Sequence, residues 1–420
     1  MRPTLHTHCR LASIYCIAAA LSLPIALLNL SKLMALLSTI ALMVVSPANK
    51  GSLAWHRLMP FRLIVAAFLL FWVSASWSAG TSNEIFKSVS QHGNLLVIPV
   101  LYYLIRTRRE AAIALGIYLI GQFLLTMSTY ALYFQIPVPW KMTDTGQPYA
   151  VFSSYLDQPI MTAVFAAITW HLRELLPEKR RDYSAIAIIC MALGVIFFIF
   201  IGRTGHLVAL SLITLVVFWE MPRRFRPAIV IVPVLVSLVA LSFSSKVNER
   251  FKVAVIEIQA ALERGDVSKD QTSTGLRMNY WLNSIRSIET SPWIGHGAGS
   301  WNSQYNAIQK RLTGNEFVET SANAHQEYLF WGVELGLLGI ALLLAILVSF
   351  YLMSTTLPGP SRRATQSVLA AIATACLFNC ALYDAYIGDY LCITLALVIC
   401  YGMKPMHENA RPLSATSPGI

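Results

Sequence analysis

The sequence predicts an all-α protein that crosses a membrane many times. Hydrophobic residues make up 56% of the 420 residues, charged residues make up only 13%, and the mean hydropathy is +0.57. Apolar runs long enough to cross a bilayer as a helix recur along the chain, and a soluble core of this size would not need so many of them. We therefore expect a polytopic helical membrane protein.

Twelve apolar segments are candidate transmembrane helices. We interpret the first two as retained spans, not as a cleaved signal peptide, because no clear small-residue cleavage site follows the first and the second begins almost at once. An even number of spans places both chain ends on the same side. The candidates are residues 11–30, 33–45, 63–78, 95–105, 111–134, 159–172, 185–201, 206–219, 228–243, 329–353, 367–383 and 388–403.

The distribution of lysine and arginine predicts the orientation. With the N-terminus inside, the inner segments hold nineteen of the 32 basic residues, the short outer turns hold four and one long outer loop holds nine. Short cytoplasmic loops of membrane proteins carry this excess of positive charge. The net charge of +11 is therefore explained by loops at the inner leaflet, and we expect no nucleic-acid partner.

The long outer loop is predicted to be mostly helical. Residues 247–262 place apolar side chains at intervals of three and four among charged ones, which indicates an amphipathic helix, and residues 276–288 are predicted to form a second helix. Gly295, Gly297 and Gly299 then form a turn-rich stretch. Spaced glycines can cradle phosphate, but with no strand before them a tight connection is favoured.

His325 stands where this polar loop passes into the apolar run of residues 329–353. An imidazole titrates near neutral pH, so at a membrane–water boundary it can accept a proton while facing a lipid-borne and a water-borne group. The alternative is an interfacial polar residue at the end of a helix. His325 is the candidate general base.

Two outer arginines are candidate anion ligands. Arg203 directly follows an apolar run and lies close to hydrocarbon depth, where a charge is costly unless it is paired. No acid lies near it in the sequence, so an anionic ligand or a lipid phosphate would be its partner. Arg277 heads the second loop helix, where the alternative is a solvated surface residue. A guanidinium binds two oxygens at once and stays charged, which suits a diphosphate.

These residues carry a resemblance to a known family. Arg203 to Leu207 is similar to an Arg-x-x-x-Leu element, and His325-Gln326, followed after nine residues by Gly336-Leu-Leu-Gly339, is similar to the His-(Asn/Ser/Gln)-x9-Gly-x-x-Gly element of bacterial O-antigen ligases. Residues 292–299 resemble the Pro-x-x-Gly-x-Gly loop of the wider O-antigen ligase and polymerase superfamily. The resemblance covers residues 185–350 by motif and the whole chain by architecture.

The resemblance implies an enzyme that moves a polysaccharide from undecaprenyl diphosphate to a sugar of the lipid A core, at the periplasmic face of the bacterial inner membrane. His325 would be the base, and Arg203 and Arg277 would bind the donor diphosphate. Residues 1–243 would hold helices 1–9, residues 244–325 a periplasmic catalytic loop, residues 326–403 helices 10–12 and residues 404–420 a cytoplasmic tail.

We predict no metal and no cofactor. The chain has no Asp-x-Asp pattern, and the outer loop has no cluster of histidine and acidic residues at ligand spacing. The seven cysteines fall mainly in apolar runs and form neither a disulfide framework nor a zinc pattern. No covalent nucleophile presents itself, so we expect a single displacement with inversion.

Several residues are weaker candidates for substrate binding. His206 could assist at the diphosphate or merely end a helix, and Asp389, with Asp384, flanks the last predicted outer turn and could orient a sugar or cap a helix. Tyr280 and Trp301 could stack on sugar rings, although anchoring at the membrane interface would also explain them. Glu319 and Glu327 lie near the base in sequence and could orient it.

Other functions remain open at this point. An O-antigen polymerase would use the same donor with a second lipid-linked glycan as acceptor, and the spacing after His325 favours the ligase. A protein O-oligosaccharyltransferase is less favoured, because those chains usually carry additional C-terminal sequence. A non-enzymatic transporter of lipid-linked glycans would tend to have ionisable residues within its spans and internal repeats, and neither is evident.

Overall fold

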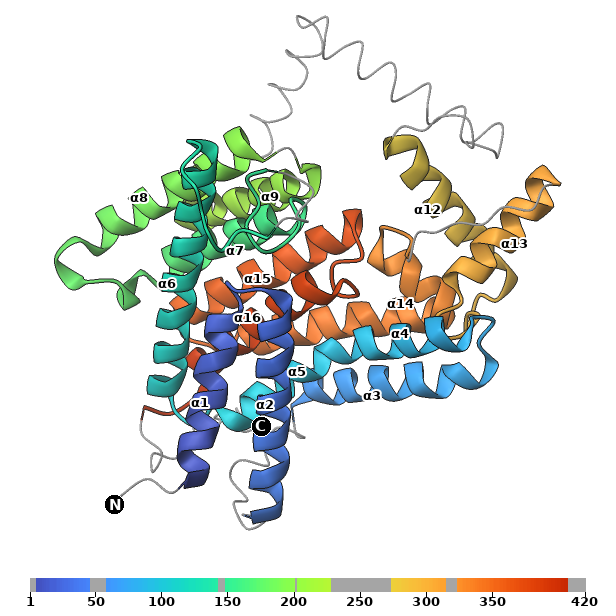
Figure 1. The fold of residues 1–420 in the computed structure, drawn as a ribbon, viewed down its shortest axis with the longest axis horizontal. Coiled ribbons are helices and arrows are strands. Elements are labelled where there is room, and N and C mark those ends of the chain that lie inside the picture. Colours follow the sequence, from blue (N-terminus) through green and yellow to red (C-terminus); the bar gives the residue numbers. More distant parts are fainter. Residues whose placement is uncertain are drawn as a thin grey trace, which may run out of the picture.

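The computed structural model describes residues 5–45, 58–142, 148–200, 202–227, 273–314 and 323–406, and these residues form helices with no strand among them. Figure 1 shows α1 and α2 at the lower left and α12 and α13 at the upper right. The α-helices are α1 (Leu5–Ala20), α2 (Ile25–Val45), α3 (Met59–Ser74), α4 (Ser82–His92), α5 (Val97–Leu104), α6 (Arg108–Tyr133), α7 (Asp157–His171), α8 (Arg181–Gly194), α9 (Arg203–Glu220), α12 (Ser273–Thr290), α13 (Trp301–Thr313), α14 (Glu327–Ser354), α15 (Gly359–Phe378) and α16 (Ala385–Met403).

The fold is that of an all-α polytopic membrane protein, as the composition predicts. Among the described residues, seven helices are long and apolar enough to cross a membrane: Ile25–Val45, Met59–Trp77, Arg108–Tyr133, Glu178–Ile199, Arg203–Glu220, Glu327–Ser354 and Ala385–Met403. The predicted spans at residues 95–105, 159–172 and 367–383 also overlap helices, but α5 has only 8 residues and α7 has 15. The predicted span at residues 228–243 and the predicted amphipathic helix at residues 247–262 lie outside the described residues. The predicted loop helix at residues 276–288 is confirmed as α12.

The first helical hairpin turns at a different place from the prediction. The sequence predicts a turn after residue 30, with Lys32 in an outer loop, whereas the chain turns at residues 21–24 and Lys32 lies inside α2. Pro24 explains the turn, because proline has no N–H to donate and is favoured just before a helix begins. Lys32 is tolerated within the helix because its ammonium group lies 2.5 Å from a carboxylate oxygen of Asp389.

Helix α16 forms the centre of the bundle. Every residue from Tyr386 to Gly402 is buried, and α5, α6 and α15 pack around the helix. The Tyr118 hydroxyl of α6 hydrogen-bonds the Tyr390 hydroxyl of α16 at 2.6 Å, and the Tyr390 hydroxyl also donates to the carbonyl oxygen of Met161 in α7 at 2.9 Å. A helix that is apolar on all sides is expected at such a buried position.

The glycine-rich stretch of residues 292–299 docks against a break in α14. Gly336 has φ +68° and ψ −159°, so α14 is interrupted there. The amide of Leu337 donates to the carbonyl of Pro292 at 2.7 Å, and the amide of Gly297 donates to the carbonyl of Glu334 at 2.8 Å. The stretch therefore forms hydrogen bonds with the backbone N–H and C=O groups that lose their helical partners at the break. Non-helical backbone within a membrane protein is tolerated only when such groups are satisfied by other parts of the protein.

Close approach of backbones explains why glycine occupies both sides of this junction. A Cβ on Gly295 would lie 2.5 Å from the backbone nitrogen of Gly336, and a Cβ on Gly336 would lie 2.5 Å from the backbone of Trp293. Gly297 and Gly299 also have positive φ and approach the backbone between α3 and α4 and within α4. The prediction of a tight connection at these glycines is confirmed, because only glycine fits such contacts.

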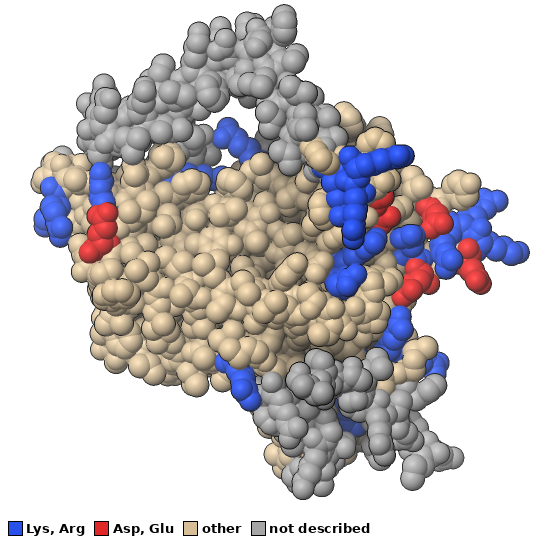
Figure 2. All heavy atoms as spheres, turned by 180° about the vertical axis from the view of Figure 1, so that it is seen from behind, with Lys and Arg blue, Asp and Glu red and all other residues tan. Residues whose placement is uncertain are grey.

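The outer surface carries few charges around its middle. Figure 2 shows a broad area without Lys, Arg, Asp or Glu, with charged side chains gathered mainly toward its right-hand edge. Large exposed apolar side chains are numerous, and they include Leu37, Trp72, Phe86, Ile120 and Phe198. A surface of this kind is suited to contact with lipid.

Candidate active site

His325 lies in a short turn that leads into α14. Its backbone is left-handed, with φ +50°, which costs a non-glycine residue roughly 1–2 kcal/mol. Its N–H donates to Oδ1 of Asn323 at 3.0 Å. Gln326 then caps α14, and its side-chain oxygen accepts from the N–H of Leu329 at 2.5 Å. The residue after the histidine thus starts the helix, and the turn holds the imidazole just outside it.

The imidazole is held from the end of α15. Nδ1 of His325 lies 3.2 Å from Oδ1 of Asn379, the residue that follows α15, and Nδ2 of Asn379 donates to Oδ2 of Asp384 at 3.3 Å. An amide oxygen only accepts hydrogen bonds, so this contact assigns the proton to Nδ1 and leaves the lone pair on Nε2. The arrangement suits a histidine that accepts a proton through Nε2.

Asp384 ionises less readily than an ordinary aspartate. Burial, together with the charges of Asp157 and Glu327, raises the pKa of Asp384 to about 8. It lies in the connection between α15 and α16, at the start of α16. Its hydrogen bond with Asn379 is therefore suited to orient that side chain.

An aromatic cluster covers one face of His325. Tyr280 of α12 stacks on the imidazole, with ring centroids 5.8 Å apart and ring planes at 25°. Tyr280 also makes edge contacts with Trp301 and Tyr305, each with centroids 5.4 Å apart. The indole N–H of Trp301 donates to Ser284 at 3.0 Å. Tyr280 is 7% exposed and Trp301 is 2% exposed, so both belong to a buried wall, unlike anchors at a membrane interface.

Arg203 and Arg277 lie near each other although 74 positions separate them in the sequence. Arg203 is the exposed first residue of α9, which begins without a side-chain cap, and Arg277 is half-buried in the first part of α12. Burial lowers the pKa of Arg277, and the positive charge of Arg203 lowers it further. Tyr155 is a second ionisable group close to Arg277, after Arg203.

This pair of guanidinium groups is suited to bind an anion. Among the described residues, no group forms a hydrogen bond or an ion pair with Arg277. A charge such as that of Arg277, which is partly removed from water near a like charge, is costly unless a negative charge joins it. The start of α9 adds backbone N–H groups that point toward the same end of the helix as Arg203.

The two remaining weak candidates are held by other parts of the protein. Nδ1 of His206 donates to the carbonyl of Gly202 at 2.7 Å, and its ring packs against Phe197 with centroids 5.4 Å apart, which agrees with its alternative as a helix-terminal residue. Asp389 lies inside α16, not beside the turn as predicted, because α16 already begins at Ala385. Its side chain is fully buried and is paired with Lys32.

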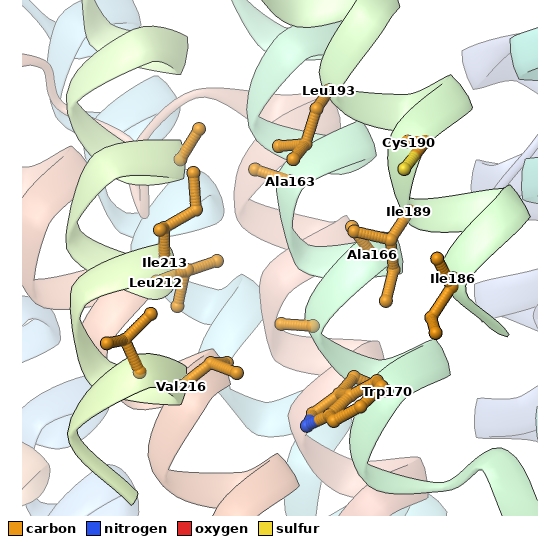
Figure 3. Close-up of a pocket in the computed structure, with 13 residues that line it drawn as sticks. Ala163, Ala166, Trp170, Ile186, Ile189, Cys190, Leu193, Leu212, Ile213 and Val216 are labelled. Atoms are coloured by element: carbon orange, nitrogen blue, oxygen red, sulfur yellow. The ribbon is translucent and has the colours of Figure 1, made fainter. Parts of the chain in front are cut away.

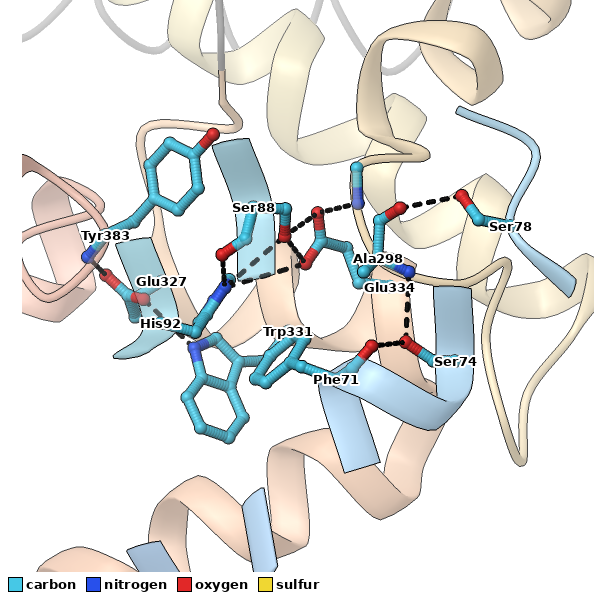
Figure 4. A network of polar contacts seen from close by, with 11 residues as sticks. Phe71, Ser74, Ser78, Ser88, His92, Ala298, Glu327, Trp331, Glu334 and Tyr383 are labelled. Carbon is cyan, nitrogen blue, oxygen red and sulfur yellow. Dashed lines mark hydrogen bonds and ion pairs between the residues drawn. The ribbon is translucent and has the colours of Figure 1, made fainter. Parts of the chain in front are cut away.

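Two buried glutamates of α14 organise the surroundings of the site (Figure 4). Glu327 accepts from the indole N–H of Trp331 at 3.0 Å and from the amide of Leu382 at 2.9 Å, so its carboxylate is directed into the bundle. Glu334 accepts from the hydroxyl of Ser88 at 2.8 Å and from the amide of Gly299 at 2.7 Å. Glu334 thereby ties α14 to α4 and to the glycine-rich stretch. Glu319, the other acid near His325 in the sequence, lies outside the described residues.

A metal site is not apparent in the described part of the chain. No three His, Cys, Asp or Glu side chains gather closely enough there to hold an ion.

An apolar cavity of about 270 Å³ lies between α7, α8 and α9. Figure 3 shows the aliphatic side chains that line it and Trp170. On α9 the lining begins at Ala209, six residues after Arg203, or about 9 Å along the helix axis. The cavity therefore begins within two turns of the arginine pair and continues toward the far end of α9.

Sequence reasoning did not identify Asn379 or Tyr155. Asn379 is a polar residue within the predicted apolar span of residues 367–383, and such a residue is a signal for a functional position. Tyr155 lies in a connection of mixed composition that offers no such signal.

Comparison with known proteins finds a family match over part of the chain. Residues 186–344 match the model of the O-antigen ligase family, whose members are O-antigen ligases and polymerases. An uncharacterized protein of Haemophilus influenzae is 30% identical over 122 residues, which is 28% of this chain and 29% of that relative. The matched region contains Arg203, Arg277, the glycine-rich stretch and His325. Over residues 186–344 this chain is therefore similar to the O-antigen ligase family.

Proposed function

We propose that this protein is an O-antigen ligase: a glycosyltransferase that moves O-antigen polysaccharide from undecaprenyl diphosphate to a hydroxyl group of a lipid A core sugar. The family match over residues 186–344 supports the broader function, which is action on lipid-linked glycans in polysaccharide biosynthesis. The reaction would take place at the periplasmic face of the bacterial inner membrane, within lipopolysaccharide biosynthesis.

One observation carries this proposal: α12 connects the anion-binding pair to the histidine. Arg277 and Tyr280 are three residues apart and therefore lie on the same side of α12, about 4.5 Å apart along its axis. Arg277 lies near Arg203, and Tyr280 stacks on His325. Adjacent turns of α12 would thus contact both the diphosphate leaving group, through Arg277, and the proton acceptor His325, through Tyr280.

The proposed reaction is a single displacement. The acceptor hydroxyl oxygen forms a bond to the anomeric carbon of the donor sugar, the bond from that carbon to the diphosphate oxygen breaks, and the hydroxyl proton passes to Nε2 of His325. Arg203 and Arg277 stabilise the negative charge that grows on the departing diphosphate. One displacement inverts the configuration at the anomeric carbon.

The apolar cavity beside α9 is the proposed place for the polyprenyl chain of the donor. It is lined by residues such as Ala163, Leu193 and Leu212, and it begins about 9 Å from Arg203 along α9. A diphosphate held at Arg203 and Arg277 would leave its lipid chain free to follow this apolar surface, where burial of each CH₂ group contributes about 0.8 kcal/mol.

The proposal includes neither metal nor cofactor. The charge on the diphosphate would be balanced by Arg203 and Arg277 in place of a cation. Residues 244–325 would act as the periplasmic catalytic loop, residues 404–420 would be cytoplasmic, and residues 1–243 and 326–403 would supply the membrane helices.

A transfer assay with purified protein tests the proposal. The full chain is supplied with undecaprenyl diphosphate glycan and, in separate reactions, with lipid A core or with a second portion of the lipid-linked glycan. Extension of the lipid A core is the expected result. Extension of the lipid-linked glycan alone would instead identify an O-antigen polymerase. Movement of the glycan lipid across proteoliposome membranes without transfer would identify a transporter.

A further inference from the structure

A second cavity, of about 170 Å³, lies between α4, α14 and the start of α13. It is separate from the apolar cavity beside α9 and is the more polar of the two. Its walls include Asn83, Glu84 and Lys87 on α4, Trp301 and Asn302 at the start of α13, and Tyr383 before α16. The volume is below the range of about 300–1,000 Å³ that is typical for drug-sized ligands, so the cavity is suited to one small ring.

The cavity is lined by hydrogen-bond donors and acceptors and by aromatic rings. Asn302 donates through Nδ2 to Glu84 at 3.1 Å, while its buried Oδ1 atom has no partner among the described residues. Lys87 is exposed at the wall and supplies a donor. A buried amide oxygen without a partner is rare and indicates a missing ligand or water. Trp301 and Tyr383 add aromatic surface.

The charges at the walls do not favour an anion. Glu84 balances Lys87, which is the one basic residue in the lining. A diphosphate would find no net positive charge here and would be attracted to Arg203 and Arg277. A ring that carries hydroxyl groups can donate to carboxylates, accept from an ammonium group and place its CH face on an aromatic ring without charge of its own.

One chain of contacts and one electrostatic effect connect the cavity to the candidate base. Trp301, in its wall, touches Tyr280, which stacks on His325. Lys87, also in its wall, is close enough to Asp384 to lower the pKa of that carboxyl, against the larger effect of burial. Asp384 in turn hydrogen-bonds Asn379, which holds His325.

We propose that this cavity is a subsite for one uncharged sugar ring of a glycan substrate, bound by Lys87, Asn302 and the aromatic rings of Trp301 and Tyr383. Its role in transfer rests on the proposed function, whereas binding of a sugar ring can be measured without any turnover. The ring belongs either to the acceptor glycan or to the first sugars of the donor, and both present the same neutral polyol chemistry.

The test uses substitutions of two residues that line the cavity. Asn83 and Ser82 are neighbouring exposed residues at the start of α4, but only Asn83 lines the cavity. Asn83→Trp fills the cavity, and Ser82→Trp is the matched control with the same added side chain. Asn302→Leu removes the unpaired amide oxygen at nearly constant volume.

Binding is measured first, by saturation-transfer NMR with the full chain in lipid nanodiscs and the methyl glycosides of glucose, galactose and N-acetylglucosamine as probes. We expect saturation transfer to at least one glycoside with wild type and Ser82→Trp, and loss of the signal with Asn83→Trp and Asn302→Leu. No glycoside signal in the wild type, or an undiminished signal in Asn83→Trp, would overturn the proposal whether or not the enzyme transfers polysaccharide.

Kinetics then identify which substrate supplies the ring. We expect Asn83→Trp to raise KM about tenfold or more for one glycan and to leave KM for the other unchanged. A rise in KM for lipid A core assigns the subsite to the acceptor, and a rise for the undecaprenyl diphosphate glycan assigns it to the donor. An unchanged KM for both substrates contradicts the proposal.

Discussion

Nδ1 of His325 faces Oδ1 of Asn379 at 3.2 Å, across 54 positions of sequence. The contact joins the start of α14 to the end of α15 and determines which ring nitrogen carries the proton. Asn379 is itself oriented by Asp384, to which its amide nitrogen donates at 3.3 Å. The geometry therefore assigns Asn379 a positioning role for the proposed base.

Replacement of Asn379 should affect catalysis more than donor binding. Asn379→Leu removes the acceptor for Nδ1–H, so the imidazole loses its fixed tautomer and kcat should fall by about 10² with little change in KM for the donor. Asn29→Leu, the same change at an exposed position of α2, is the control.

The pH profile separates this role from a structural one. Asn379→Asp keeps an acceptor and adds negative charge, which favours the protonated imidazole, so the acid limb of kcat/KM should move to higher pH. A kcat/KM profile for Asn379→Asp that coincides with that of wild type would count against the positioning role.

Substitutions at His325 and at the two arginines should have different effects. His325→Ala removes a proton acceptor and leaves the arginine pair intact, so donor binding should persist while turnover falls by about 10² or more. Arg203→Lys and Arg277→Lys keep a charge but lose the two-pronged donor, and should weaken donor binding as well as turnover.

Arg286→Lys is the matched control, because Arg286 also lies on α12 but donates to Asn283. Each variant must first be shown to be folded and inserted in the membrane. The assignment of roles is wrong if His325→Ala transfers glycan at nearly the wild-type rate, or if it loses donor binding while the Arg→Lys variants retain it.

Transfer should be independent of divalent cations. Arg203 and Arg277 are proposed to balance the diphosphate charge, so activity should survive EDTA and should not rise with Mg²⁺ or Mn²⁺. The measurement is the initial rate of glycan transfer by chelator-treated protein. Activity that returns only when a metal ion is added would refute this prediction.

Gly336→Ala should destabilise the protein. The backbone angles at Gly336 are accessible essentially only to glycine, so a side chain there costs about 1–3 kcal/mol in backbone strain alone. The added Cβ would also lie 2.5 Å from the backbone of Trp293. We expect a lower midpoint of thermal unfolding in detergent.

Gly116→Ala in α6 is the control for this stability measurement, because nothing lies within 4 Å of an added Cβ there. Alanine favours helix over glycine by up to about 1 kcal/mol, so the control should be neutral or slightly more stable. Equal unfolding midpoints for Gly336→Ala and wild type would show that the junction between α14 and the glycine-rich stretch tolerates a side chain.

Cysteine labelling should place α13 and the start of α15 on opposite sides of the membrane. Lys310 of α13 and Arg362 of α15 are both exposed. In a chain whose exposed cysteines Cys9, Cys16 and Cys190 are replaced by serine, a membrane-impermeant maleimide added to intact spheroplasts should label Lys310→Cys and not Arg362→Cys. Labelling of both positions from the same side would show that the predicted orientation is wrong.

The sequence by itself determined the fold class, because membrane crossing depends on local properties. A run of apolar residues of sufficient length predicts a helix wherever it occurs, and the confirmed helices α3, α6 and α14 follow from such runs. The short motifs around Arg203 and His325 were also visible locally, and they correspond to the family that matches residues 186–344.

Only the tertiary structure decided how distant residues meet. Lys32 can lie inside α2 because Asp389 of α16 forms an ion pair with it. The first hairpin therefore turns earlier in the chain than the sequence predicts. The partner of His325 comes from the end of α15, and the packing brings Arg203 of α9 near Arg277 of α12. Such contacts depend on how helices that are far apart in the sequence pack together. The sequence of neither helix carries a periodic pattern that indicates which residue of the other helix it will contact.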